Sequence, residues 1–466
     1  MKRRHTFPLP LVLIALSMLV AALACNLTDN APPPSLVPRA TFTPPPTIGF
    51  PTLAPEEFPD QATNVPRVET QTDTTLLNVM NRVEPDRLIM HIDALVGMRT
   101  RHVLSSWTSP TEGIGAAYNY ILNQFNLIRD QSYQNSFAVL QPQEFAVNFA
   151  DINTFSRNII GVLQGTETGA GIILIGAHYD SITRDVENGN TFAPGANDNA
   201  SGIAALMEIA RVMSQTPHRA TVMFVAFGAE EIQRKGSTAF VNDYLRANNI
   251  QIDAMFNMDV IGSSTSGTGA VNDYTIRLFS AEPNESSSRH LARTLNLLGA
   301  RLAPGMAIDV QPTVDRDGRY GDHMSFSDAG FASVRFTEAL EEPDRHHTER
   351  DTKDDIQISY LMRATQTILA VTTAMADGLR PPRSVQLREG DNGFRTLVWE
   401  RVPEAAGYLI ALRPPGSLIY SDYFEVNDNQ VTWDGFRADR FASVAVAAKD
   451  ASGLIGPFSF EYTIGS

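Results

Sequence analysis

Short apolar runs alternate with amphipathic stretches through the middle of this 466-residue chain, and that alternation limits the possible folds most. Residues 171–176 form a run that is too short for a helix and apolar on both faces, as in a strand buried on two sides. Further strands are predicted at residues 220–227, 253–260, 274–279 and 333–336, and helices at 201–213, 236–246, 286–298 and 358–379. This order predicts an α/β fold in which helices sandwich a mixed, mainly parallel sheet.

A helical pattern also precedes these strands. From about residue 73 to residue 128, residues recur at the helical spacing of three and four, as Leu88, Ile92 and Leu95 do. Pro381 and Pro382 then interrupt the last predicted helix, and no helical period follows them. We therefore predict that residues 73–380 form one large α/β domain.

The segment after this domain has the pattern of a small all-β module. Apolar runs at 396–399, 407–412 and 443–448 are separated by turn residues, which predicts a β-sandwich over residues 381–466. With Trp399 in its core and the pair Gly407-Tyr408 in a strand, the segment resembles a fibronectin type III module. It departs from that module at Ala442, where a tyrosine is usual. We expect it to fold separately, as a spacer or as a module that binds a surface or polymer.

The amino terminus has the pattern of an export signal. Lys2, Arg3 and Arg4 precede an apolar run at residues 11–24, which predicts a signal peptide over residues 1–24. The run is shorter than the roughly 20 residues that a membrane-spanning helix needs. We expect the protein to be exported and extracytoplasmic.

Cys25, the only cysteine of the chain, directly follows this signal. Residues 22–25 resemble a bacterial lipoprotein cleavage box, which implies that Cys25 is lipidated and anchors the protein to the cell membrane. A plain secretory signal that ends near a cysteine is the alternative. Eleven prolines lie between residues 31 and 66, so residues 25–72 are predicted to be an extended, proline-rich linker.

The charge of the chain argues against one class of partner. Its formal net charge is −15 at pH 7, which gives no electrostatic support for binding nucleic acid. We predict no nucleic-acid partner.

Acidic residues and histidines recur where the predicted strands end. They are His178 and Asp180 after the first buried strand, Asp198 before the helix at 201, Glu230 and Glu231 after the next strand, Asp259 after the following one, and His347 before the last helix. Singly, each has an ordinary explanation: a loop histidine, a solvated pair of glutamates, or an aspartate that caps a helix. Their repeated position at the carboxyl ends of strands, where an α/β sheet leaves a crevice, instead predicts one shared site.

In this order the motifs resemble the co-catalytic di-zinc aminopeptidases, which include bacterial leucine aminopeptidases, aminopeptidase S and glutamate carboxypeptidase II. The resemblance covers residues from about 88 to 379. It implies a catalytic domain that binds peptide substrates and two Zn²⁺ ions per chain. The implied ligands are His178 and Asp259 for one ion, Glu231 and His347 for the other, and Asp198 as the bridge between them.

The resemblance also assigns two carboxylates that do not bind metal. Glu230 matches the general base, which takes a proton from the attacking water. Asp180 matches the carboxylate that orients the imidazole of His178, since such a partner fixes the tautomer of a metal-binding histidine. The nitrogen and oxygen donors suit catalytic zinc, and two such ions can activate water beside a polarised carbonyl.

Several alternatives remain open in the sequence. His346 competes with His347 for the ligand role, although Thr348 and Asp351 follow His347 at the family's spacing. His323 is either a pocket residue or a structural histidine, and Tyr320 is a candidate to stabilise the oxyanion. The alternative functions are a one-zinc, glutaminyl cyclase-like acyltransferase and a non-catalytic peptide-binding relative. Trimming from the carboxyl terminus also stays open.

Overall fold

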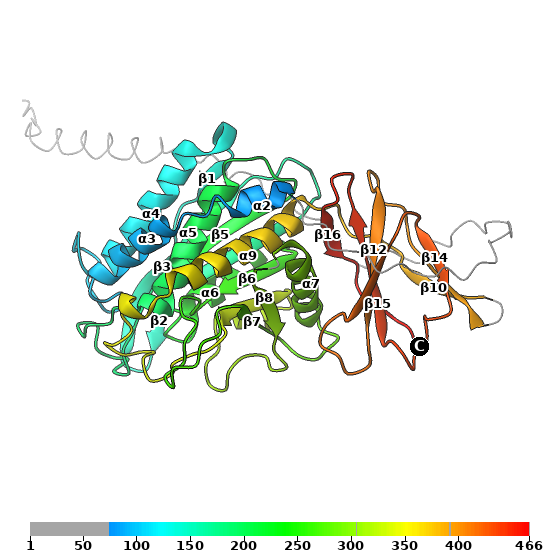
Figure 1. Cartoon of the computed structure of the whole chain (residues 1–466). Coiled ribbons are helices and arrows are strands. Elements are labelled where there is room, and N and C mark those ends of the chain that lie inside the picture. Colours follow the sequence, from blue (N-terminus) through cyan, green and yellow to red (C-terminus); the bar gives the residue numbers. More distant parts are fainter. Residues whose placement is uncertain (1–73, 304, 391–392, 466) are drawn as a thin grey trace, which may run out of the picture. The chain divides into compact units, whose positions relative to one another are not determined.

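The computed structural model describes residues 74–303, 305–390 and 393–465 (Figure 1). The predicted signal peptide, Cys25 and the proline-rich linker lie outside these residues. Among the described helices, none is both long and apolar enough to cross a membrane. Within the described residues, three α-helices and one short 3-10 helix precede the first strand: α2 (Thr74–Met80), α3 (Pro85–Gly97), α4 (Gly113–Gln131) and η1 (Tyr133–Asn135).

A nine-stranded mixed sheet forms the centre of the α/β domain (Figure 1). Its strands are β1 (Phe137–Val139), β2 (Gln143–Phe149), β3 (Ile152–Leu163), β4 (Ile172–His178), β5 (Thr221–Phe227), β6 (Ala254–Met258), β7 (Thr275–Ser280), β8 (Ala307–Val310) and β9 (Ser333–Glu338). The order is β1-β3-β5-β4-β6-β9-β7-β8, with β2 paired to β3. The four central strands β5, β4, β6 and β9 are parallel, so their carboxyl ends meet at one edge.

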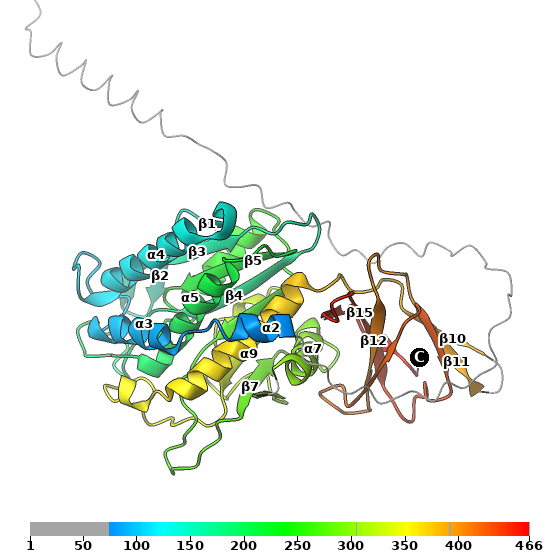
Figure 2. The same cartoon turned by 45° about the horizontal axis from the view of Figure 1, so that its top comes forward.

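Helices cover both faces of this sheet. The helices after β3 are η2 (Ala196–Ala200), α5 (Ser201–Met213), α6 (Lys235–Ala239), η3 (Phe240–Arg246), α7 (Ser287–Leu302), α8 (His323–Ser327), η4 (Lys353–Asp355) and α9 (Ile358–Asp377). Figure 2 shows α5 and α9 lying across one face. On β5, Phe224 belongs to the core cluster on that side, whereas the ring of Phe227 packs against Phe240 and Phe326. Alternate side chains of one strand thus enter two helix layers, which explains the apolar run without alternation.

The predicted α/β fold with a mainly parallel sheet is confirmed. Helix α5 has the predicted bounds, and β4, β5, β6, β7 and β9 lie within two residues of their predicted positions. Strands β1 to β3, strand β8 and helix α8 were not predicted. They leave the parallel centre intact, and β1 to β3 extend one side of the sheet with antiparallel pairing.

The carboxyl-terminal segment is all-β, as predicted. It contains a three-stranded sheet, β10 (Gln386–Glu389), β11 (Arg395–Val398) and β14 (Gln430–Trp433), and a five-stranded sheet, β12 (Gly407–Arg413), β13 (Asp422–Val426), β15 (Ser443–Lys449), β16 (Ile455–Phe458) and β17 (Tyr462–Thr463). All its pairings are antiparallel. Its likeness to a fibronectin type III module and the domain bounds remain predictions.

Contacts cross the predicted boundary near residue 380. Arg293 of α7 is fully buried and donates to Glu461 at 2.7 Å, and Arg301 of the same helix donates to Glu425 at 2.9 Å. One core cluster also contains residues of α7, α9 and β16. The β-module therefore covers part of the helical layer, and its separate folding stays a prediction.

Candidate metal centre

The residues expected to form one site do meet at the carboxyl edge of the four parallel strands. His178 is the last residue of β4, Glu230 and Glu231 follow β5, and Asp259 directly follows β6. Two further segments complete the group. The short helix η2, before α5, contains Asp198, and the segment between β9 and α9 contains His347. We call these six residues the His–carboxylate cluster. Parallel pairing brings their strand ends together although they lie far apart in the sequence.

Asp198 lies between the two histidines. Its Oδ1 is 3.2 Å from Nε2 of His178, and its Oδ2 is 3.3 Å from Nε2 of His347. Beyond this carboxylate, His178 Nε2 is 3.5 Å from Asp259 Oδ1, and His347 Nε2 is 2.9 Å from Glu231 Oε2. The geometry is that of two adjacent groups of donors that share one carboxylate.

The donor atoms suit metal cations. Three sets of possible ligands among the described residues each have atoms within 4.8 Å of one another: His178 with Asp198 and Asp259, Asp198 with Glu231 and His347, and His178 with Glu230 and Glu231. The Asp259 Oδ1 and Glu231 Oε1 atoms are buried and have no hydrogen-bond partner among the described residues. A buried carboxylate oxygen without a partner is costly, and a cation bound there would satisfy it. Nitrogen and oxygen donors are those that catalytic zinc uses.

The pKa values of the cluster show that protons compete for the same atoms. Burial would lower the pKa of His178, but the negative charges of Asp259 and Glu230 raise it well above its ordinary value. The charge of Glu231 outweighs burial at His347 and raises its pKa to about 11. Because a metal-binding imidazole must be neutral, a cation has to displace these protons, and its affinity falls as the pH falls.

Asp180 and Asp351 fix the backbone around the cluster. The carboxylate of Asp180 accepts hydrogen bonds from the backbone amides of Glu230 at 3.0 Å and Glu231 at 3.1 Å. Its Oδ1 is 3.5 Å from Nδ1 of His178, which lies nearer, at 3.2 Å, to the backbone carbonyl of Asp180. Asp351 accepts from the amides of Asn197 and Asp198 at 2.8 and 2.9 Å. The proposed orienting role of Asp180 stays a prediction, and its shortest contacts hold the two glutamates.

The structure distinguishes the three residues whose roles the sequence left open. His347 reaches the cluster, whereas the ring of neighbouring His346 is buried against Arg319. His323 is fully buried with its Nε2 3.2 Å from the Val314 carbonyl, which favours a structural role. Tyr320 is 43% exposed, so its side chain is accessible from solvent.

Arg335 contacts the cluster and Asp315 contacts Arg335, and neither residue was predicted from the sequence. Arg335, in β9, lies 2.9 Å from Asp259 Oδ2, and its other terminal nitrogen lies 2.9 Å from Asp315. The available signal was a charged residue inside a strand predicted to be buried, because such a charge needs a partner. The sequence does not reveal which carboxylate is that partner.

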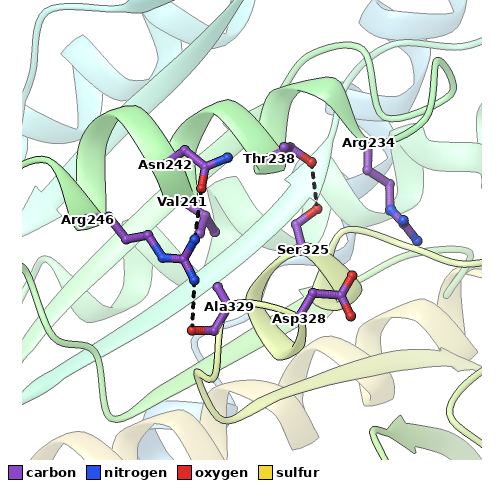
Figure 3. A pocket seen from close by; sticks show the side chains of 8 residues that line it. All are labelled: Arg234, Thr238, Val241, Asn242, Arg246, Ser325, Asp328 and Ala329. Atoms are coloured by element: carbon purple, nitrogen blue, oxygen red, sulfur yellow. Dashed lines mark hydrogen bonds between the residues drawn. The ribbon is translucent and has the colours of Figure 1, made fainter.

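A separate hollow of about 200 Å³ lies between α8 on one side and α6 and η3 on the other (Figure 3). Its lining residues are Arg234, Thr238, Val241, Asn242, Arg246, Ser325, Asp328 and Ala329. None of these belongs to the His–carboxylate cluster. The Ser325 hydroxyl of α8 lies 2.9 Å from the Ser237 hydroxyl and 3.1 Å from the Thr238 hydroxyl, both in α6. These contacts join α8, which follows Asp322, to α6, which follows Glu231.

Fold and cluster together place the chain among α/β proteins whose cation-binding side chains gather at the carboxyl edge of a sheet. The sequence model of peptidase family M28 matches residues 158–372, and the chain belongs to this family. A probable zinc metalloprotease of Leptosphaeria maculans is 30% identical over 326 residues, which cover 64% of this chain and 75% of that protein. A probable zinc metalloprotease of Pyricularia oryzae is 29% identical over 396 residues, which cover 76% of this chain and 78% of that protein.

A solved structure shares the fold. The LapA aminopeptidase of Legionella pneumophila superposes with a TM-score of 0.51 at 19% sequence identity, covering 66% of this chain and 76% of that one. The matched family segment contains all six residues of the His–carboxylate cluster, and Arg335 as well.

Proposed function

We propose that this protein is a zinc-dependent aminopeptidase that holds two zinc ions in the His–carboxylate cluster. The main support is the position of Asp198, because its two oxygens lie 3.2 Å from the His178 imidazole and 3.3 Å from the His347 imidazole. His178 and Asp259 would hold one ion, and Glu231 and His347 the other. This donor set supports two ions over the single ion of a cyclase-like enzyme. It also supports an enzyme over a binding protein that has lost its ligands.

Each residue of the cluster has a separate part in the proposed reaction. Two zinc ions in this position would polarise the scissile carbonyl and lower the pKa of the attacking water. Glu230 takes the proton of that water and passes it to the leaving amine. Burial raises the pKa of Glu230 well above its ordinary value, with help from the charges of Asp322 and Asp259. Asp180 accepts a hydrogen bond from the backbone amide of Glu230 and so helps to position the segment that carries the base.

Within this proposal, the enzyme removes residues from the amino terminus of its peptide substrates. The supports for this specificity are the resemblance of the motifs to di-zinc aminopeptidases and the fold shared with LapA, which is named an aminopeptidase. The test compares aminoacyl arylamides with the same compounds acetylated at the amine. We expect hydrolysis of the free amines alone and its loss on zinc chelation. Equal cleavage of both sets would contradict an aminopeptidase, and trimming of acetylated peptides from their carboxyl end would indicate a carboxypeptidase.

We also propose that the protein is exported and held at the cell membrane by a lipid on Cys25, with the carboxyl-terminal module free to bind a surface or polymer. The supports are the apolar run at residues 11–24, the single cysteine and the prolines after it. Cys25→Ser should release the protein from membranes or block processing. If labelled palmitate is not incorporated into the wild-type protein, a plain secreted enzyme is the better description.

A further inference from the structure

Arg335 forms a buried ion pair with one oxygen of a proposed metal ligand. It lies in β9, which pairs in parallel with β6, the strand that Asp259 follows. The Arg335 Nη2 atom is 2.9 Å from Asp259 Oδ2, and the two side chains are 5% and 2% exposed. The other oxygen, Asp259 Oδ1, has no hydrogen-bond partner among the described residues and faces His178. The two oxygens of this carboxylate thus have different surroundings.

The guanidinium is itself held from a second side. Its Nη1 donates to Asp315 Oδ2 at 2.9 Å and to the backbone carbonyl of Arg319 at 3.0 Å. Asp315 in turn accepts from the backbone amide of Gly321 at 3.1 Å. A guanidinium whose two terminal nitrogens contact two different carboxylates has little freedom to rotate, so it can define the orientation of Asp259.

The loop that contains Gly321 packs closely against Arg335 and Asp259. A Cβ atom on Gly321 would lie 3.0 Å from both Asp259 Oδ2 and Arg335 Nη1, and 2.8 Å from Asn257 Nδ2. Contacts of 3.0 Å are tighter than carbon normally makes, so a larger residue at position 321 would require the loop or its neighbours to shift. The loop, the arginine and the carboxylate are therefore packed as one unit.

We infer that Arg335 is a positioning residue for metal binding: it occupies Asp259 Oδ2 and so leaves Oδ1 alone to bind the cation beside His178. The inference rests on the proposed two-zinc function. Glu231, the carboxylate of the other group, has no arginine among its ion pairs within the described residues, and its ion pair there is with His347. Arg335 thus acts on one of the two cation positions, and the positions are unequal.

The test measures stepwise zinc affinity by competition with a chromophoric chelator in the wild-type protein and in Arg335→Gln. Loss of an outer-shell partner of a metal ligand typically costs about 10–100-fold in metal affinity. We expect a loss of this size at one site and an unchanged affinity at the other. Arg335→Lys, which keeps the positive charge, should restore part of the loss. Asp315→Asn, which keeps Arg335 but weakens its anchor, should cause a smaller loss at the same site.

Arg277→Gln is the matched control, because Arg277 lies on neighbouring β7 and pairs with Glu341, not with a member of the cluster. It should lower the melting temperature without changing either zinc affinity. Wild-type affinity at both sites in Arg335→Gln would overturn the inference. So would an equal loss at both sites that follows the melting temperature, because that is a purely structural effect. A wild-type protein that binds no zinc would refute the proposed function itself.

Discussion

At the scale of single residues, Glu230 and Glu231 are neighbours with the same side chain and different surroundings. Glu231 Oε2 lies 2.9 Å from His347 Nε2, and its other oxygen has no partner among the described residues. Glu230 has no such contact with His347, and its pKa is raised by burial first. We therefore expect Glu231→Gln to lose zinc from one site and to lower both stability and rate.

Glu230→Gln should keep both zinc ions and the fold. Its turnover should fall by about 10²–10⁴-fold, since an amide cannot accept the proton of the attacking water. Zinc content and turnover of the two variants, measured side by side, check this division. Near-wild-type turnover in Glu230→Gln, or zinc loss as large as in Glu231→Gln, would show that the roles are assigned wrongly.

The sequence shows the ligands of the cluster more readily than the residues around them. His178, Glu231 and Asp259 end or follow recognisable parallel strands, and that topology brings them to one edge, whereas Asp198 and His347 reach it from segments before helices. Arg335 differs, because its partner Asp315 lies in a loop whose path depends on tertiary packing. A charged residue in a buried strand signals that a partner exists without identifying it.

At the scale of elements, a local feature explains why strands β2 and β3 were not predicted from the sequence. Strands β2 and β3 form a hairpin in which Phe149 pairs with Ile152, so Ala150 and Asp151 make the turn. Ala150 has a φ of 47°, in the left-handed region that glycine and asparagine favour. Without either residue the usual hairpin signal is absent. Helix α5 shows a regular helical pattern, and its bounds in the structure, Ser201–Met213, are those predicted from the sequence.

The contact between α3 and α4 supports a pH prediction. His91 of α3 is buried with its Nδ1 2.8 Å from the Tyr120 hydroxyl of α4. Burial, with the positive charges of Arg87 and Arg211, lowers its pKa from 6.5 to about 4. The unfolded chain therefore takes up this proton first, and the stability present above pH 6.5 is lost as the pH falls toward 4.

His91→Gln should remove this contribution, because glutamine does not titrate. Between pH 7 and pH 5 the unfolding free energy of the wild-type protein should fall by about 2 kcal/mol more than that of the variant. Urea unfolding in the presence of a chelator measures this difference without the titration of a metal site. Parallel pH profiles for the two proteins would contradict the assignment.

At the scale of the whole molecule, the carboxyl-terminal module and the α/β domain share a buried ion-pair network. Glu461 accepts from Arg293 at 2.7 Å and from Arg413 at 3.1 Å, and these arginines are 0% and 5% exposed. Breaking a buried pair by removing one partner costs about 3–5 kcal/mol, because the other charge is left without a partner. Glu461→Ala should destabilise the protein by about this amount, as thermal unfolding would show.

Glu404→Ala is the matched control for this network. Glu404 also pairs with an arginine of the α/β domain, Arg219, but is 73% exposed. An exposed pair contributes about 0–1 kcal/mol, so this variant should unfold close to the wild-type temperature. Equal effects of the two substitutions would show that the network does not join the module to the α/β domain.

Zinc content measured together with activity tests most directly whether the His–carboxylate cluster holds two catalytic zinc ions. Purified protein is stripped of metal, reloaded with known amounts of zinc, and assayed on an aminoacyl arylamide while elemental analysis counts the bound ions. The shared carboxylate of Asp198, between His178 and His347, predicts two zinc ions per chain and no hydrolysis in the stripped protein. One ion at full activity, or hydrolysis that persists without metal, would contradict it.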